Sequence, residues 1–294
     1  MKDFRGTGVA MVTPFTKSKE VDFAALERLT DHLITGGVDY LVVQGTTGES
    51  ATLTKSEKQE VLSSVVKTNN GRVPIVWGHG GNNTQALIDG FKQFDLTGVD
   101  AVLAASPYYN KPTQPGIVAH YNAYADASPL PVILYNVPGR TSSNMLSTTT
   151  LELAKHPNII AIKEASGNLD QVGDIIKNRP AKFLVLSGDD PLIVPHMALG
   201  GDGIISVVAN AFPKQFSDIA RLCFQGDYNK ARSLHYLLVD FIHLLFAEGN
   251  PGGIKAALNI LGIMENEVRL PLVPVSAELM RKLESSIDQI NKAS

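Results

Sequence analysis

The stretch Ile159-Ile160-Ala161-Ile162-Lys163-Glu164 gives the clearest indication of the fold. Its four successive apolar residues form a continuous run, which is typical of a parallel strand covered on both faces. Seven further runs of this kind occur in the chain, and amphipathic stretches of helical period separate them. The predicted strands are residues 8–12, 40–44, 74–77, 101–105, 132–135, 159–162, 183–186 and 203–208.

Eight strands that alternate with helices favour an α/β fold of the closed (β/α)8 type, a TIM barrel, over an open doubly wound sheet. The glycine fingerprint of a dinucleotide-binding sheet is incomplete, because Asn83 stands where the last glycine of the stretch 78–83 would be. Three more helical patterns follow the eighth strand. We therefore expect a catalytic barrel over residues 1–224 and a C-terminal helical extension over 225–294, packed on the barrel.

Composition excludes several classes of protein. The 294 residues carry a net charge of −3 and contain no basic block, which argues against nucleic acid as a partner. Apolar runs end well before the roughly 18 residues of a membrane span, and the N-terminus lacks the pattern of a signal peptide. The single cysteine, Cys223, fits a reducing compartment. We expect a cytoplasmic protein that acts on a small molecule and binds no membrane.

The active site of such a barrel lies at the carboxyl ends of the strands. Polar residues gather at four of these ends. The segments are Gly45-Thr46-Thr47-Gly48-Glu49-Ser50, Ser106-Pro107-Tyr108-Tyr109-Asn110, Tyr135-Asn136-Val137-Pro138-Gly139-Arg140-Thr141 and Lys163-Glu164-Ala165-Ser166-Gly167.

Lys163 is the most informative of these residues, because it follows four apolar residues on a strand that should contact only packed protein. Burial favours the neutral amine of a lysine, which is a nucleophile toward carbonyl groups. Taken alone, Lys163 is better explained by a salt bridge with Glu164 or another barrel carboxylate. The other strand ends favour catalysis, because they supply hydroxyls that can move protons and a cation suited to a carboxylate. These are Thr46, Thr47, Tyr109, Tyr135 and Arg140.

Metal and phosphate chemistry have little support in the sequence. The seven histidines form no His-Glu-x-x-His pair. Asp189 and Asp190 could bind a divalent ion, but their position directly before Pro191 fits a helix N-terminus better. The chain also has no Gly-x-Ser-x-Gly elbow and no glycine-rich phosphate loop after the eighth strand.

Together these motifs resemble the dihydrodipicolinate synthase family, within the pyruvate-dependent class I aldolase and N-acetylneuraminate lyase superfamily. The resemblance runs from Thr7 to about Leu261. It implies that Lys163 forms a Schiff base with pyruvate, and that the derived enamine attacks L-aspartate 4-semialdehyde. The product would be 4-hydroxy-tetrahydrodipicolinate, on the diaminopimelate route to lysine. The protonated imine would serve as the electron sink, so the resemblance implies neither a metal nor an organic cofactor.

The resemblance also assigns roles to further residues. Tyr135 would transfer protons, and Thr46 and Tyr109 would complete a hydroxyl relay. Tyr109 or its neighbour Tyr108 would reach across a subunit interface, in a homotetramer built as a dimer of dimers. The remaining matches are Thr47 and Ile205 as pyruvate ligands, Arg140 as the carboxylate ligand of the second substrate, and Gly188, Asp189 and Asn250 near the pocket.

A possible lysine effector site differs from the pattern common in this family. Two histidines often found there are replaced by Lys55 and Lys58, and an acidic residue is replaced by Ala86. The loss of an acidic partner and the gain of two cations predict weak or absent inhibition by lysine. The residues that match the effector site are Ser50, Ala51, Asn82 and Tyr108.

Two other functions remain open from the sequence. One is a sister pyruvate aldolase that cleaves N-acetylneuraminate or a 2-keto-3-deoxy sugar acid. The other is a non-catalytic barrel that binds a small acid. Arg140 and the double-threonine motif favour the synthase over the sister aldolases.

Overall fold

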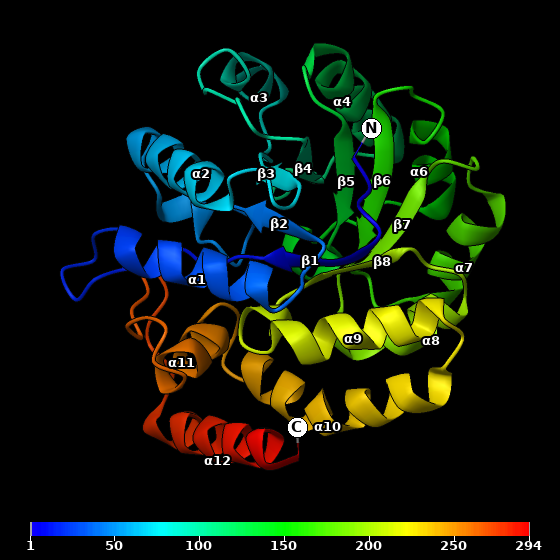
Figure 1. The fold of residues 1–294 in the computed structure, drawn as a ribbon. Helices are drawn as coiled ribbons and strands as arrows, with labels where there is room; N and C mark the ends of the chain where they lie inside the picture. The colour runs from blue at the N-terminus through cyan, green and yellow to red at the C-terminus, as the bar shows by residue number, and fades with distance from the viewer. Residues whose placement is uncertain (1, 294) are drawn as a thin grey trace.

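A computed structural model describes residues 2–293 as a closed barrel of eight parallel strands with helices around it (Figure 1). Each strand pairs with its neighbours in sequence, and the last strand pairs back with the first. The predicted (β/α)8 fold is therefore confirmed. The strands are β1 (Gly6–Ala10), β2 (Tyr40–Val43), β3 (Ile75–Gly78), β4 (Ala101–Ala105), β5 (Val132–Asn136), β6 (Ile159–Glu164), β7 (Leu184–Ser187) and β8 (Gly203–Ser206).

The barrel closes through a glycine contact between β1 and β8. Gly6 pairs with Gly203 in register, and a Cβ atom at Gly203 would lie 2.1 Å from the carbonyl oxygen of Gly6. Gly203 has a φ of +141°, which L side chains rarely adopt. This contact starts β1 two residues earlier than predicted, because backbone atoms make it and it leaves no apolar side chain for the sequence pattern to detect.

Helices on the outside of the barrel connect the strands (Figure 1). Their apolar faces pack on the outer face of the barrel, as Leu26, Leu29 and Leu33 of α1 do. Short 3-10 helices lie at Ser50–Thr52, Asp190–Leu192 and Val208–Asn210. The helices up to the end of the eighth βα unit are α1 (Phe23–Thr35), α2 (Lys55–Asn69), α3 (Thr84–Gly90), α4 (Gln114–Ala127), α5 (Pro138–Thr141), α6 (Ser147–Leu153), α7 (Leu169–Asn178), α8 (Ile193–Ala198) and α9 (Pro213–Phe224).

Three further helices follow α9 and lie together on one side of the barrel, at the bottom of Figure 1. They are α10 (Tyr228–Phe246), α11 (Gly252–Ile260) and α12 (Ala277–Ala293). α10 packs against α9 and α12, and α11 packs against α10 and α12. Their buried residues belong to the same apolar cluster as the outer face of the barrel. No helix within residues 2–293 is long and apolar enough to cross a membrane.

Several histidines are buried in the fold. His120 of α4 is 6% exposed, and its Nδ1 lies 2.8 Å from the hydroxyl of Thr84. Its Nε2 is buried and has no hydrogen-bond partner among residues 2–293. Burial lowers the pKa of His120 to about 4, and burial also lowers the pKa of His79 and of His196.

A pH prediction follows from His120. The folded state binds fewer protons than the unfolded state between pH 6.5 and 4, so the stabilisation present above pH 6.5 is lost as the pH falls through this window. By pH 4.5 the loss from His120 should be on the order of 2 kcal/mol. Urea unfolding of His120→Gln at pH 7 and 4.5 should show a smaller pH-dependent loss than the parent. His243→Gln, which changes an exposed histidine, is the control and should lose as much as the parent.

Candidate active site

A cavity of about 330 Å³ opens at the carboxyl ends of the strands. Segments that follow β2, β5, β7 and α10 line it together with the end of β6. The position agrees with the rule that barrel enzymes place their chemistry at this end. The predicted site residues that line the cavity are Thr46, Thr47, Tyr135, Arg140, Lys163, Gly188, Asp189 and Asn250.

A one-residue bulge in β6 directs Lys163 into this cavity. Val132 of β5 pairs with Ile159, but the next residue of β5 pairs with Ala161, so Ile160 is an extra residue. Ile160 and Ala161 therefore both pack inside the barrel, and Ile162 packs against the helices. The bulge shifts the alternation of side chains by one position, and Lys163 points inward as a result.

The amine of Lys163 lies beside an aromatic ring. Its Nζ lies 4.4 Å from the ring centroid of Tyr135, the residue that pairs with it on β5. Among residues 2–293, no carboxylate forms an ion pair with Lys163. Burial raises the pKa of Asp189 in the same cavity, and the charge of Lys163 opposes that shift.

Glu164 lies on the opposite face of β6. Its carboxylate accepts hydrogen bonds from Asn136 Nδ2 and Gln171 Nε2, each at 3.0 Å, and from the backbone N–H of Ser166 at 2.7 Å. These bonds fix the end of β6 to β5 and α7. The alternative of a Lys163–Glu164 salt bridge is therefore wrong, because successive residues of a strand face opposite sides.

Because Gly188 has no side chain, the Lys163 side chain can occupy the space next to it. A Cβ atom at Gly188 would lie 2.9 Å from Lys163 Cε and 2.7 Å from the Cβ of Ala165. Either contact forces a neighbour to move. The predicted position of Gly188 near the pocket thus has a steric reason.

Asn250 joins the C-terminal helices to the cavity. It lies just before α11, and its Nδ2 donates a hydrogen bond of 2.9 Å to the hydroxyl oxygen of Thr47. Its carbonyl oxygen accepts one of 3.4 Å from Arg140 Nη2. Asn250 therefore holds both the threonine and the arginine at the mouth of the site.

Two predicted residues do not line the cavity. Tyr109 is 87% exposed and lies in the loop after β4 with a φ of +70°, so its hydroxyl is not part of the site within one chain. Ile205 is buried in β8 and belongs to the apolar cluster inside the barrel, together with Tyr135. Its backbone pairs with Gly8 of β1.

The predicted effector residues divide between a second cavity and the surface. This cavity, of about 520 Å³, shares Thr46 and Arg140 with the first one. Lys58 lines it, and burial lowers the pKa of this lysine. Of the predicted effector residues, Ser50, Ala51 and Tyr108 line the cavity, whereas Lys55 and Asn82 are exposed and do not line it.

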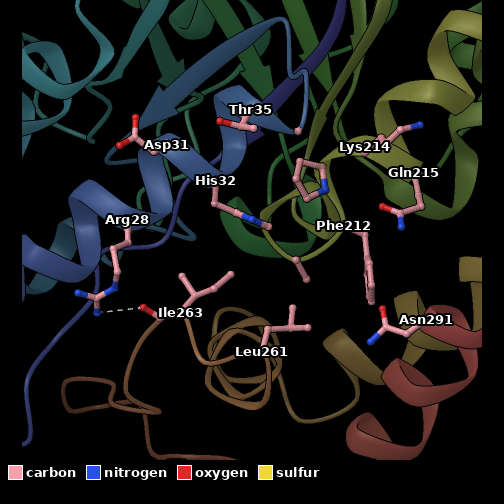
Figure 2. Close-up of a pocket in the computed structure, with 13 residues that line it drawn as sticks. Arg28, Asp31, His32, Thr35, Phe212, Lys214, Gln215, Leu261, Ile263 and Asn291 are labelled. Carbon is pink, nitrogen blue, oxygen red and sulfur yellow. Dashed lines mark hydrogen bonds between the residues drawn. The ribbon is translucent and has the colours of Figure 1, made fainter. Parts of the chain in front are cut away.

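A larger cavity, of about 740 Å³, lies away from the strand ends. Figure 2 shows it between α1, the start of α9 and the C-terminal helices, with His32 directed toward its centre. On its rim, Arg28 donates a hydrogen bond of 3.2 Å to the carbonyl oxygen of Ile263. None of the predicted site residues lines this cavity, and in the described part of the chain no cluster of His, Cys, Asp or Glu could hold a metal ion.

The sequence interpretation missed a second buried lysine. Lys255 of α11 is completely buried and forms an ion pair with Glu49, three residues after Thr46. The signal was available, because Lys255 interrupts an apolar stretch of α11 as Lys163 interrupts that of β6. Glu49 belongs to the segment 45–50 that follows the second predicted strand, but the sequence pattern does not indicate a role for it.

The fold and the cavity place the chain among (β/α)8 barrels that carry a buried lysine beside hydroxyl groups at the carboxyl ends of the strands. The model of the dihydrodipicolinate synthetase family matches residues 3–290, and the chain belongs to this family. It is 50% identical to the 4-hydroxy-tetrahydrodipicolinate synthase of Phocaeicola vulgatus over 287 residues, which are 97% of each chain.

Solved structures agree with the family. A chloride-inhibited dihydrodipicolinate synthase from Acinetobacter baumannii, complexed with pyruvate, is 38% identical with a TM-score of 0.95, and covers 98% of this chain and 99% of its own. A monomeric dihydrodipicolinate synthase variant is also 38% identical with a TM-score of 0.95, and covers 98% of this chain and 97% of its own.

The steric role of Gly188 gives a prediction. Gly188→Ala should displace the Lys163 side chain and slow its reaction with pyruvate at least tenfold, on the order of the loss expected when a reacting group is misplaced by about 1 Å. The measurement is the rate of adduct formation on Lys163 when pyruvate and borohydride are present. Gly139→Ala is a matched control, because Gly139 lines the same cavity and its Cβ would meet nothing within 4 Å. Equal rates for the two variants would contradict the steric role.

Proposed function

We propose that this chain is a lyase of the synthase type that condenses pyruvate with L-aspartate 4-semialdehyde to give 4-hydroxy-tetrahydrodipicolinate. The observation that carries the proposal is the Lys163 amine, which is buried in a cavity beside Tyr135 and free of any carboxylate partner in the described residues. Membership of the family supports the choice of substrates. The product would enter the diaminopimelate route to lysine.

In the first half of the reaction, the Lys163 Nζ attacks the ketone carbon of pyruvate. The carbinolamine then loses water, with protons moved by the hydroxyls of Tyr135 and Thr46, and an imine forms. Loss of a proton from the methyl carbon gives an enamine. The hydroxyl of Thr47, fixed by Asn250, holds the pyruvate carboxylate.

In the second half, the enamine carbon attacks the aldehyde carbon of the semialdehyde. Arg140 lies at the mouth of the cavity, where its guanidinium binds the carboxylate of this substrate. The amine of the substrate then displaces Lys163 by transimination, and the six-membered ring closes. The protonated imine accepts the electrons throughout, so no metal or organic cofactor takes part.

We further propose that the site is completed by a second subunit in a homotetramer, a dimer of dimers, in the cytoplasm. Tyr109 and Tyr108 are 87% and 44% exposed in the loop after β4, and exposed aromatic side chains of this size are typical of an interface. The buried free thiol of Cys223 suits a reducing compartment. Analytical ultracentrifugation measures the oligomeric state directly.

The central prediction concerns Lys163. Pyruvate and borohydride should add the mass of one reduced pyruvyl group to Lys163, and Lys163→Met should give no adduct. A coupled assay with aspartate semialdehyde should show turnover by the parent. An adduct without this turnover would indicate a sister aldolase, and the absence of an adduct would indicate a non-catalytic barrel.

Arg140 allows the two substrates to be tested separately. Arg140→Ala should keep the pyruvate adduct but lower kcat/KM for the semialdehyde about 100-fold, since a charge-assisted contact to a carboxylate contributes roughly 3 kcal/mol. Steady-state kinetics with each substrate varied in turn provide the measurement. An equal loss for pyruvate trapping would contradict the assigned role.

Lysine should inhibit weakly or not at all. Lys58 lines the second cavity and adds a positive charge that would repel a ligand ammonium, and the exposed Ala86 carries no negative charge that would bind it. Initial rates measured with millimolar lysine should match those without it. Strong inhibition at low lysine concentration would contradict this prediction.

A further inference from the structure

A completely buried ion pair links α11 to the turn after β2. The side chains of Lys255 and Glu49 are 0% and 1% exposed. Lys255 Nζ also donates a hydrogen bond of 2.8 Å to the carbonyl oxygen of Glu267 and lies 4.0 Å from the ring centroid of Phe15. All residues of Gly252–Leu258 around it are buried. Because a buried ammonium requires a compensating charge, the Glu49 carboxylate must reach α11.

Arg269 encloses the pair from the other side. Its backbone N–H donates a hydrogen bond of 3.0 Å to Glu49 Oε2, so both carboxylate oxygens have a partner. Its guanidinium stacks over Phe15, at 4.4 Å from the ring centroid, and pairs with Glu57 of α2. The Glu49 carboxylate is thus held at a single position.

Glu49 ends a tight turn that carries Thr46 and Thr47. Its N–H donates a hydrogen bond of 3.1 Å to the carbonyl oxygen of Thr46, and Gly48 N–H donates one of 3.1 Å to Gly45. Glu49 has a φ of +51°, a left-handed conformation that glutamate rarely adopts. Such a conformation persists where the surroundings fix the residue, and the buried carboxylate provides that constraint.

The same segment of the chain holds the middle of the turn. Asn250 donates to the Thr47 hydroxyl at 2.9 Å, and five residues later Lys255 holds Glu49. The backbone N–H of Lys255 donates to the carbonyl oxygen of Pro251 at 3.0 Å, so both holding residues belong to one helix start. The turn therefore has two attachment points on a single rigid element.

We propose that Glu49 and Lys255 are positioning residues for the reaction. Their ion pair holds the Thr46–Thr47 turn in place in the cavity that also contains the Lys163 amine. The proposal rests on the proposed function in that the two threonine hydroxyls serve the pyruvate half of the reaction. Displacement of the turn would misplace the proton relay and the pyruvate ligand together. Lys163 itself lies on β6 and would stay in place.

The test removes both charges at once. Glu49→Gln combined with Lys255→Met keeps the volumes and leaves no unpaired buried charge. We expect a folded protein by circular dichroism whose kcat/KM for pyruvate is lowered at least tenfold. Arg179→Met combined with Asp202→Asn is the matched control, because it removes a largely buried ion pair at the amino ends of β7 and β8. The control should lose thermal stability but keep kcat/KM within twofold of the parent.

A second variant keeps both charges and changes only the geometry. Glu49→Asp shortens the side chain by one methylene, so the ion pair can form only if the turn moves toward α11. A positioning role predicts that this variant also loses kcat/KM for pyruvate, whereas a role in stability alone predicts near-normal activity. This comparison holds even if the doubly substituted protein fails to fold.

The results of these experiments distinguish the positioning role of Glu49 and Lys255 from the proposed function. Combination of Asn250→Ala with the neutralised pair should lower kcat/KM less than the product of the separate effects, because both act on one turn. A folded neutralised variant and a Glu49→Asp variant that both match the parent within twofold would overturn the positioning role. Failure of the parent itself to form a pyruvate adduct would instead overturn the proposed function.

Discussion

The orientation of the Lys163 side chain depends on one extra residue in β6. If the strand alternated regularly from Ile159, which faces the helices, then Lys163 would face the helices too and Glu164 would lie inside the barrel. The bulge at Ile160 reverses both. Hydrogen bonds on the outer face of the barrel stabilise this orientation, because the Glu164 carboxylate accepts them from Asn136 and Gln171. In the opposite phase, this carboxylate would lose its hydrogen bonds to these two side chains.

The sequence revealed the existence of β6 but could not reveal its phase. Both faces of this strand are covered, so an apolar residue can lie on either face. Four successive apolar residues therefore do not indicate which of them point into the barrel. The start of β1 was also not visible in the apolar pattern, because a close backbone contact between two glycines sets this boundary. The barrel as a whole could be predicted, because eight apolar runs at the spacing of βα units suit no other common sheet as well.

The residues that line the candidate cavity could be predicted where they follow the strands directly. Thr46, Tyr135, Arg140 and Lys163 all lie at strand ends, and a closed parallel barrel brings such ends together whatever the loops do. Contacts between segments that are distant in sequence could not be predicted from the positions of the strand ends. The bond from Asn250 to Thr47 joins residues 203 positions apart, and only the packing of α10 and α11 decides that they meet.

The two buried lysines have similar sequence surroundings but different contacts in the structure. Lys163 and Lys255 both interrupt apolar stretches, and both are withdrawn from water. Lys255 has a carboxylate and a carbonyl oxygen as fixed partners, so its amine is committed to holding the turn of Glu49. Lys163 has an aromatic ring on one side and an open cavity on the other. Burial is common to both residues, and the presence or absence of a carboxylate partner therefore distinguishes the lysine that holds the site from the one available to react.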